Sequence, residues 1–292
     1  MSTLDRIAAA PPRTRSDELW AFSLLGALLI ALYAPVLTHL VGQWWSDPNY
    51  GHGFLVPVLS GYLLWRSRDA WRDIPWRPRA SGAFFIVAAL LLLAAGTLGA
   101  ELFLSRISLL VLLGGLVVFF AGWRLLRAWS FPFGFLLFMI PLPAIIYYQI
   151  TFPLQLLASR LAGFCLDLLQ VPALREGNLI VLPNYTLAVA EACSGIRSLL
   201  SLLALAVAFG YLLEPRLWKR FALVVLMVPI AIATNAIRIV GTGVMTFAFG
   251  SRWAEGFFHA FSGWLMFVVA FAFLLLAHRA LQFRARRGKE LP

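Results

Sequence analysis

The sequence has few charged residues. Asp, Glu, Lys and Arg make up 13% of its 292 residues, whereas a soluble domain carries roughly 25%. A soluble fold of this length could not cover its surface with so few charges. A disordered chain is also excluded, because 61% of the residues are hydrophobic. With only 2 cysteines, the chain cannot be a small secreted domain held together by several disulfides.

The sequence also lacks internal repeats, low-complexity segments and any soluble stretch long enough to fold by itself. We therefore expect one integral-membrane domain over residues 1–292. Residues 19–278 are expected to form its membrane core, and residues 1–18 and 279–292 are expected to be basic cytoplasmic tails.

Long apolar runs dominate the remaining sequence, and the mean hydropathy is +0.84. Most of the runs approach the roughly 20 residues that a transmembrane helix requires. They do not alternate like the strands of a membrane β-barrel. The sequence therefore predicts an all-α polytopic membrane protein with about eight transmembrane helices, at residues 19–41, 53–65, 82–100, 107–122, 131–148, 195–213, 221–249 and 260–277.

The chain carries a formal net charge of +11, and its basic residues are clustered between the apolar runs. If the amino terminus is cytoplasmic, 18 of the 24 Lys and Arg residues fall in cytoplasmic segments, as the positive-inside rule requires. Both termini are then cytoplasmic. The basic charge is therefore explained by orientation in the lipid bilayer, which is the expected partner, and we expect no binding of nucleic acid. Six arginines lie outside these segments: Arg106, Arg160, Arg175, Arg197, Arg238 and Arg252.

One apolar stretch, residues 151–171, contains Arg160 and Asp167. If it crossed the membrane, the basic segments after it would face outward. We therefore expect it to lie on the outer face as an amphipathic or re-entrant helix. Residues 178–190 follow it, with two arms rich in β-branched residues on either side of Pro183-Asn184. This pattern predicts a short outer-face β-hairpin.

Three polar residues stand out in the last three predicted spans, namely Cys193, Arg238 and His259. Counted at 1.5 Å per residue from the inner boundary of each helix, they lie roughly 31, 27 and 30 Å along it. The hydrocarbon core of a bilayer is about 30 Å thick. All three are therefore expected at the outer interface, on consecutive helices that usually pack as neighbours.

The chemistry of these residues is complementary. Cys193 lies at the N-terminus of a predicted helix, where free N–H groups and the helix dipole favour a thiolate and could hold an oxyanion. His259 can accept and return a proton near neutral pH. Arg238 stays protonated and could stabilise an oxyanion or orient a carboxylate.

Each residue has a structural alternative. Cys193 could be a small buried hydrophobic residue, or it could form a disulfide with Cys165. Cys165 fits the role of a small buried residue better than Cys193 does. His259 could be an ordinary interfacial side chain. Arg238 could pair with a carboxylate, for which the candidates are Glu191, Asp167 and Glu255.

Three motifs carry a resemblance to a known family. Ala192-Cys-Ser-Gly-Ile-Arg-Ser198, Asn235-Ala-Ile-Arg-Ile239 and His259-Ala-Phe-Ser-Gly263 resemble the Cys, Arg and His motifs of the exosortase/archaeosortase family. Tyr50-Gly-His-Gly-Phe-Leu-Val-Pro-Val-Leu-Ser60 and Phe138-Met-Ile-Pro-Leu-Pro143 are similar to further segments of that family. The resemblance extends from about Trp20 to His278.

The resemblance implies a membrane-embedded cysteine transpeptidase of the bacterial inner membrane, with its active site at the periplasmic face. Cys193 would be the nucleophile, Arg238 the stabilising cation and His259 the acid/base. Its substrates would be membrane-anchored proteins that end in a Pro-Glu-Pro motif, a membrane helix and a basic tail, in bacteria that make extracellular polysaccharide. No cofactor and no metal is implied.

Four further residues are candidates for substrate-binding or supporting roles, namely Arg197, Asn235, Glu191 and His52. Arg197 could bind a substrate carboxylate or pair with Glu191, and Asn235 is expected to form a hydrogen bond with a neighbouring helix. His52 could line the site, or Gly51-His-Gly53 could simply form a turn. Two other function classes stay open, a polytopic transporter and an export-assembly subunit for polysaccharide.

Overall fold

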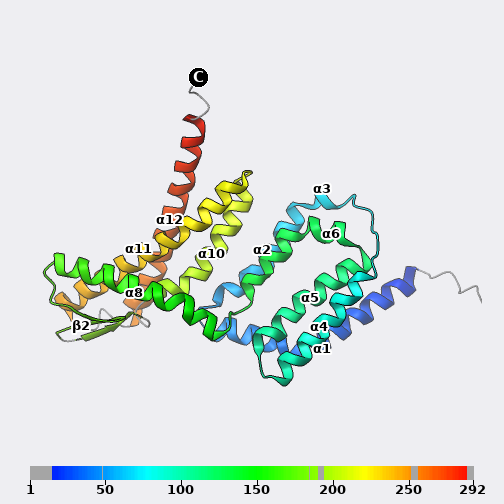
Figure 1. Cartoon of the computed structure of the whole chain (residues 1–292), viewed down its shortest axis with the longest axis horizontal. Helices are drawn as coiled ribbons and strands as arrows, with labels where there is room; N and C mark the ends of the chain where they lie inside the picture. Colours follow the sequence, from blue (N-terminus) through cyan, green and yellow to red (C-terminus); the bar gives the residue numbers. More distant parts are fainter. Residues whose placement is uncertain (1–14, 48, 184, 190–193, 251–255, 288–292) are drawn as a thin grey trace, which may run out of the picture.

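The structure is a computed structural model that describes residues 15–47, 49–183, 185–189, 194–250 and 256–287. Figure 1 shows α1, α4, α5 and α6 gathered at one end of the molecule and α8, the sheet, α11 and α12 at the other. The described elements are α1 (Arg15–Ser46), η1 (Gly51–Phe54), α2 (Leu55–Arg66), α3 (Arg68–Trp71), α4 (Ser81–Leu98), α5 (Leu102–Phe120), α6 (Trp123–Ala128), α7 (Ser130–Phe135), η2 (Leu136–Met139), α8 (Ala144–Leu168), β1 (Leu174–Glu176), β2 (Leu179–Leu182), β3 (Tyr185–Ala188), α10 (Ser194–Leu213), α11 (Leu217–Phe249) and α12 (Gly256–Arg287).

The chain is an all-α polytopic membrane protein with a small sheet. Within the described residues, five helical segments are long and apolar enough to span a membrane: Leu19–Ser46, Ser81–Leu98, Leu102–Phe120, Leu217–Phe249 and Phe261–Gln282. A bent pair, Ser130–Met139 with Ala144–Leu168, raises this number to as many as six. The other two of the eight expected spans are the short helix α2 and α10, whose described apolar part is Leu199–Leu213.

The expected span at residues 131–148 is broken in the structure. Its helix ends at Met139, and α8 starts at Ala144 with a bend of 84° between the two parts. Pro141 and Pro143 stand in the break, and proline lacks an N–H donor and keeps the residue before it out of the helical region. The expected outer-face helix at 151–171 is therefore part of one continuous helix that begins at Ala144.

The sheet has three antiparallel strands in the order β1-β2-β3. The expected hairpin is present, because Leu182 pairs with Tyr185 across the turn that contains Pro183. An additional strand, β1, pairs with β2 through a two-residue turn at Gly177-Asn178, where Gly177 has a φ of +63°. A positive φ in this position suits a tight hairpin turn and favours glycine.

The sheet packs on α8 and on the second half of α11. Its buried side chains Ile180, Leu182 and Leu187 belong to a core cluster with Ala158, Ala162 and Leu166 of α8 and Ile239 of α11. The hydroxyl of Ser159 on α8 donates a hydrogen bond to the carbonyl of Gly177 at 2.7 Å, which fixes the tight turn against the helix. Helix α8 and the sheet therefore pack together against α11 at Ile239.

Helices α10, α11 and α12 contact one another pairwise, and their shared core includes Leu202, Leu223, Met227 and Leu274. A buried polar cluster joins the α10–α11 turn to α12. The carboxylate of Glu214, 2% exposed, lies 3.8 Å from Lys219 Nζ and 3.1 Å from His278 Nδ1. It also accepts a hydrogen bond from Gln282 Nε2 at 3.0 Å. The expectation that these three consecutive helices pack as neighbours is therefore confirmed.

Candidate functional site

Arg238 is the candidate catalytic residue whose side chain the structure describes in full. It lies on α11 and is 3% exposed. Its Nε donates a hydrogen bond to Ser262 Oγ on α12 at 3.0 Å. A guanidinium remains protonated under all ordinary conditions, so this contact places a fixed positive charge at the boundary between α11 and α12.

Ser262 connects this charge to the motif that contains His259. Both residues belong to α12, and His259 precedes Ser262 by three residues, which is nearly one helical turn. Because residues three apart on a helix are neighbours on its surface, the Arg238 contact lies next to the turn that carries His259. The side chain of His259 itself lies outside the described residues.

Asn235 lies one turn before Arg238 on α11 and is 1% exposed. Neither its Nδ2 nor its Oδ1 has a hydrogen-bond partner within the described part of the chain. The hydrogen bond expected between Asn235 and a neighbouring helix is therefore not found there. A buried carboxamide without partners is unfavourable by about 1–3 kcal/mol, and in native proteins such a group calls for a specific explanation, such as a catalytic role or a bound water or ion.

The remaining parts of the expected site are described only in part. Cys193 and Glu191 lie outside the described residues. Arg197 lies in the first turns of α10, but its side chain also lies outside the part of the chain that the structure describes. The convergence of Cys193, Arg238 and His259 therefore stays a prediction. Cys165, on α8, is a free cysteine.

His52 bridges two elements. Its Nδ1 lies 2.9 Å from Ser201 Oγ on α10, and its Nε2 lies 3.2 Å from the carbonyl of Phe138 in η2. A carbonyl only accepts hydrogen bonds, so Nε2 donates to Phe138 and Nδ1 accepts from the Ser201 hydroxyl. Burial lowers the pKa of His52, and backbone hydrogen bonds to Phe138 and Asn49 oppose this effect.

These two contacts connect His52 to α10 and to η2. Both ring nitrogens are engaged, and the partner Ser201 lies seven residues, or about two turns, after the start of α10 at Ser194. His52 therefore braces the helix that directly follows Cys193. Gly53 beside it is required for a different reason, because a Cβ there would collide with the indole ring of Trp44.

Sequence analysis missed two residues of this region, Ser262 and Ser201. Ser262 is part of the quoted motif His259-Ala-Phe-Ser-Gly263, but its partner depends on how α12 is rotated against α11. Ser201 lies in an apolar stretch and carries no signal of its own. The described residues contain no group of three or more His, Cys, Asp or Glu side chains that could hold a metal ion.

The arrangement can hold developing negative charge beside α11 and α12. A buried guanidinium interacts strongly with an oxyanion because little water screens it. In comparisons with known proteins, the family model for transmembrane exosortases matches residues 44–276. No curated protein and no solved structure matches the chain. The matched region encloses the Cys, Arg and His motifs and ends before the basic tail.

Proposed function

The chain belongs to the transmembrane exosortase family, and we propose that it is a cysteine transpeptidase whose nucleophile is Cys193. The observation that carries the proposal is the contact between Arg238 and Ser262, because it joins the Arg motif to the His motif. The family match over residues 44–276 supports the same assignment. The reaction is cleavage of a C-terminal sorting signal and transfer of the new carboxyl end to an acceptor.

The first half of the reaction forms a thioester. The Cys193 thiolate attacks the carbonyl carbon of the scissile peptide bond, and the carbonyl oxygen becomes an oxyanion that Arg238 stabilises. The C–N bond then breaks, and protonated His259 gives its proton to the leaving amine. The amino-terminal part of the substrate stays attached to Cys193 as an acyl group.

The second half releases the product. An amine, or water, attacks the thioester carbonyl, and neutral His259 takes the proton from this nucleophile. The C–S bond breaks, and the thiolate of Cys193 is restored. The charges balance over both halves, because His259 gives one proton and takes one proton.

We propose that the substrates are membrane-anchored proteins that end in a Pro-Glu-Pro motif, a membrane helix and a basic tail. Docking of the substrate helix beside the spans would bring its motif to the outer interface without a deep pocket. A basic tail on the substrate would stay on the cytoplasmic side for the same reason as the 18 basic residues of this chain. Arg197 is a second cation that could bind the glutamate of the motif, and Glu191 is its alternative partner.

We also propose that the protein lies in the bacterial inner membrane, with both termini cytoplasmic and the site at the periplasmic face. Alkaline phosphatase fusions test this orientation. Fusions after Asp47 and after Leu169, both outside the long apolar segments, should be active, whereas fusions after Asp73 and after Arg287 should be inactive. The reverse pattern would contradict the proposed location of the site.

The catalytic assignment is tested by co-expression with a substrate of the tripartite type. Cys193→Ala should abolish processing, and Cys165→Ala, which changes the free cysteine on α8, is the matched control and should leave processing intact. Cys193→Ser separates a requirement for the thiolate from a requirement for side-chain size. Normal processing by a stably expressed Cys193→Ala protein would exclude cysteine catalysis at this position.

A further inference from the structure

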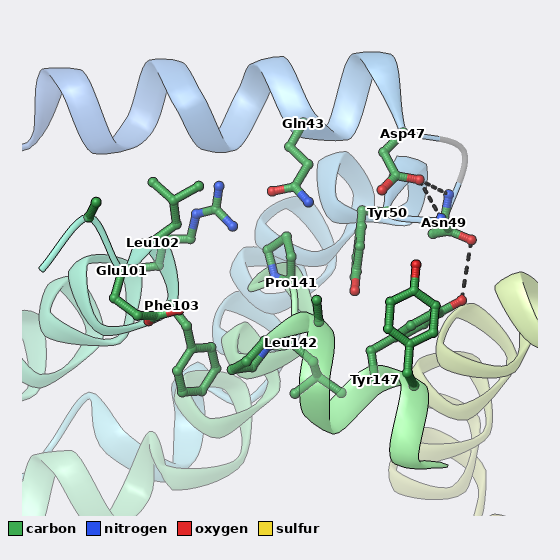
Figure 2. A pocket seen from close by; sticks show the side chains of 15 residues that line it. Gln43, Asp47, Asn49, Tyr50, Glu101, Leu102, Phe103, Pro141, Leu142 and Tyr147 are labelled. Atoms are coloured by element: carbon green, nitrogen blue, oxygen red, sulfur yellow. Dashed lines mark hydrogen bonds between the residues drawn. The ribbon is translucent and has the colours of Figure 1, made fainter. Parts of the chain in front are cut away.

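A second polar site lies away from Arg238, between the end of α1, the start of α5 and the bend before α8. It is a pocket of about 330 Å³ whose lining includes Gln43, Asp47, Glu101, Arg106 and Tyr147. Figure 2 shows Gln43 and Tyr50 projecting from the α1 side toward Pro141 and Leu142. The volume falls in the range of small-molecule sites, and the three segments that form it are far apart in the sequence.

Arg106 is the unusual residue of this pocket. It lies in the second turn of α5, lines the pocket and is 3% exposed. Its Nε and Nη2 have no hydrogen-bond partner within the described part of the chain. These two atoms form the side-on edge of the guanidinium, which donates two parallel hydrogen bonds to one phosphate or carboxylate.

The two acidic residues of the lining already accept backbone hydrogen bonds. Asp47 Oδ1 accepts from the N–H of Asn49 at 2.9 Å, and Glu101 Oε2 accepts from the N–H of Leu104 at 3.0 Å. Each carboxylate therefore has a structural role in its own segment, and each keeps oxygen lone pairs that can accept hydrogen bonds from a ligand. Among the described residues that line the pocket, Arg106 alone carries a positive charge.

Tyrosines complete the lining. Tyr50 is buried, and desolvation, with smaller contributions from Tyr147 and Asp47, raises its pKa to about 12, so it stays neutral. Tyr147 donates a hydrogen bond to Asn49 Oδ1 at 3.4 Å, and the large ring of Tyr148 is exposed. Tyrosines at the ends of membrane helices are typical of the interface where lipid headgroups lie.

We propose that this pocket binds a phosphate group, supplied by the headgroup of an outer-leaflet phospholipid or by a free phosphate. Arg106 takes two phosphate oxygens on its side-on edge, and the free lone pairs of Asp47 and Glu101 accept hydrogen bonds from hydroxyl groups on the same ligand. Phosphate fits better than carboxylate because the pocket opens at the predicted membrane interface, where phosphodiesters are the abundant anions. The proposal is independent of the chemistry at Cys193.

The test uses the purified, delipidated full chain in dodecyl maltoside. Three probes are added separately, namely inorganic phosphate, dihexanoyl phosphatidylglycerol and dihexanoylglycerol, which lacks phosphate. Binding is measured by native mass spectrometry and by the shift in the apparent melting temperature. The variants are Arg106→Gln and, as a matched control, Arg160→Gln, which changes an exposed arginine on α8.

The phosphate-bearing probes should bind, dihexanoylglycerol should not, and Arg106→Gln should weaken binding at least about tenfold. Binding of the lipid probe alone identifies the headgroup as the source, and binding of both probes identifies the phosphate itself. Equal binding by Arg106→Gln and the unchanged protein would overturn the proposal. So would no binding of either phosphate probe.

A second variant keeps the test informative if Arg106→Gln does not fold. Glu101→Gln keeps an oxygen that can accept the Leu104 N–H bond but removes one negative charge from the pocket. It should therefore tighten the binding of inorganic phosphate severalfold. Weaker or unchanged phosphate binding by a folded Glu101→Gln protein would contradict the proposed site.

Discussion

Removal of the Ser262 hydroxyl tests whether Arg238 is held in place by α12. In Ser262→Ala, Nε of a guanidinium that is 3% exposed loses the acceptor that lies 3.0 Å away. Hydrogen bonds to charged groups contribute about 1.5–3 kcal/mol, and most of that is lost when the charged partner stays buried. We expect the unfolding free energy to fall by about that amount.

The same substitution should slow substrate processing. If Arg238 stabilises an oxyanion, a small displacement of its guanidinium weakens an interaction made in the transition state. A loss of about 1.4 kcal/mol there lowers the rate about tenfold. The rate of processing is followed by pulse-chase in cells, and the apparent melting temperature is followed on the purified protein.

A control variant separates the hydrogen bond from packing. Ser262→Thr keeps the hydroxyl and adds a methyl group at a half-buried position, so it should retain most of the processing rate. If Ser262→Ala processes substrate at the normal rate and melts at the normal temperature, the contact does not position Arg238. The reasoning that joins the Arg and His motifs would then be refuted.

Three further predictions concern stability. A Cβ at Gly96 would lie 2.6 Å from the backbone nitrogen of Ser105, so Gly96→Ala should destabilise the α4–α5 pair by about 1–3 kcal/mol. Gly61 lies inside α2 with open space around it, so Gly61→Ala should be stabilising by up to about 1 kcal/mol in the same thermal unfolding assay. Because burial lowers the pKa of His52, the unfolded state binds the proton more readily, so stability should fall as the pH falls below 6.5, by at most about 1.4 kcal/mol per pH unit. His52→Gln should flatten this dependence between pH 7.5 and 5, and an unchanged slope would exclude His52 as its source. Glu214→Leu leaves buried Lys219 without its acidic partner at 3.8 Å, which should reduce the free energy of unfolding by about 3–5 kcal/mol. The double variant with Lys219→Met should recover much of this lost stability. A double variant as unstable as Glu214→Leu would show that the unpaired lysine does not cause the loss.

Much of the architecture follows from hydropathy and charge. The long apolar runs predict the spanning helices, and the β-branched arms around Pro183 predict the β2–β3 hairpin correctly. The break at 140–143 was missed because an apolar window counts residues and ignores the backbone constraints of Pro141 and Pro143. Strand β1 was missed because it has only three residues, although Gly177-Asn178 is itself a hairpin signal.

The polar sites were predicted less completely. Arg238 was identified from its position along α11, and the structure shows that its side chain is buried. The contacts of Arg238 with Ser262 and of His52 with Ser201 depend on how helices are rotated against each other, which a single sequence does not specify. The Arg106 pocket could not be predicted, because it forms where three distant segments, near residues 47, 101 and 143, meet in space.

The bridge between His52 and Ser201 has a consequence for the biosynthesis of the protein. The two residues are separated by 149 positions in the chain, and ribosomes add about 5–20 residues per second. The segment around His52 therefore emerges roughly 7–30 s before its partner exists. During that interval the segment around His52 gains its contact with Phe138, which lies 86 positions after it, and it reaches its final geometry only when α10 has entered the membrane beside it.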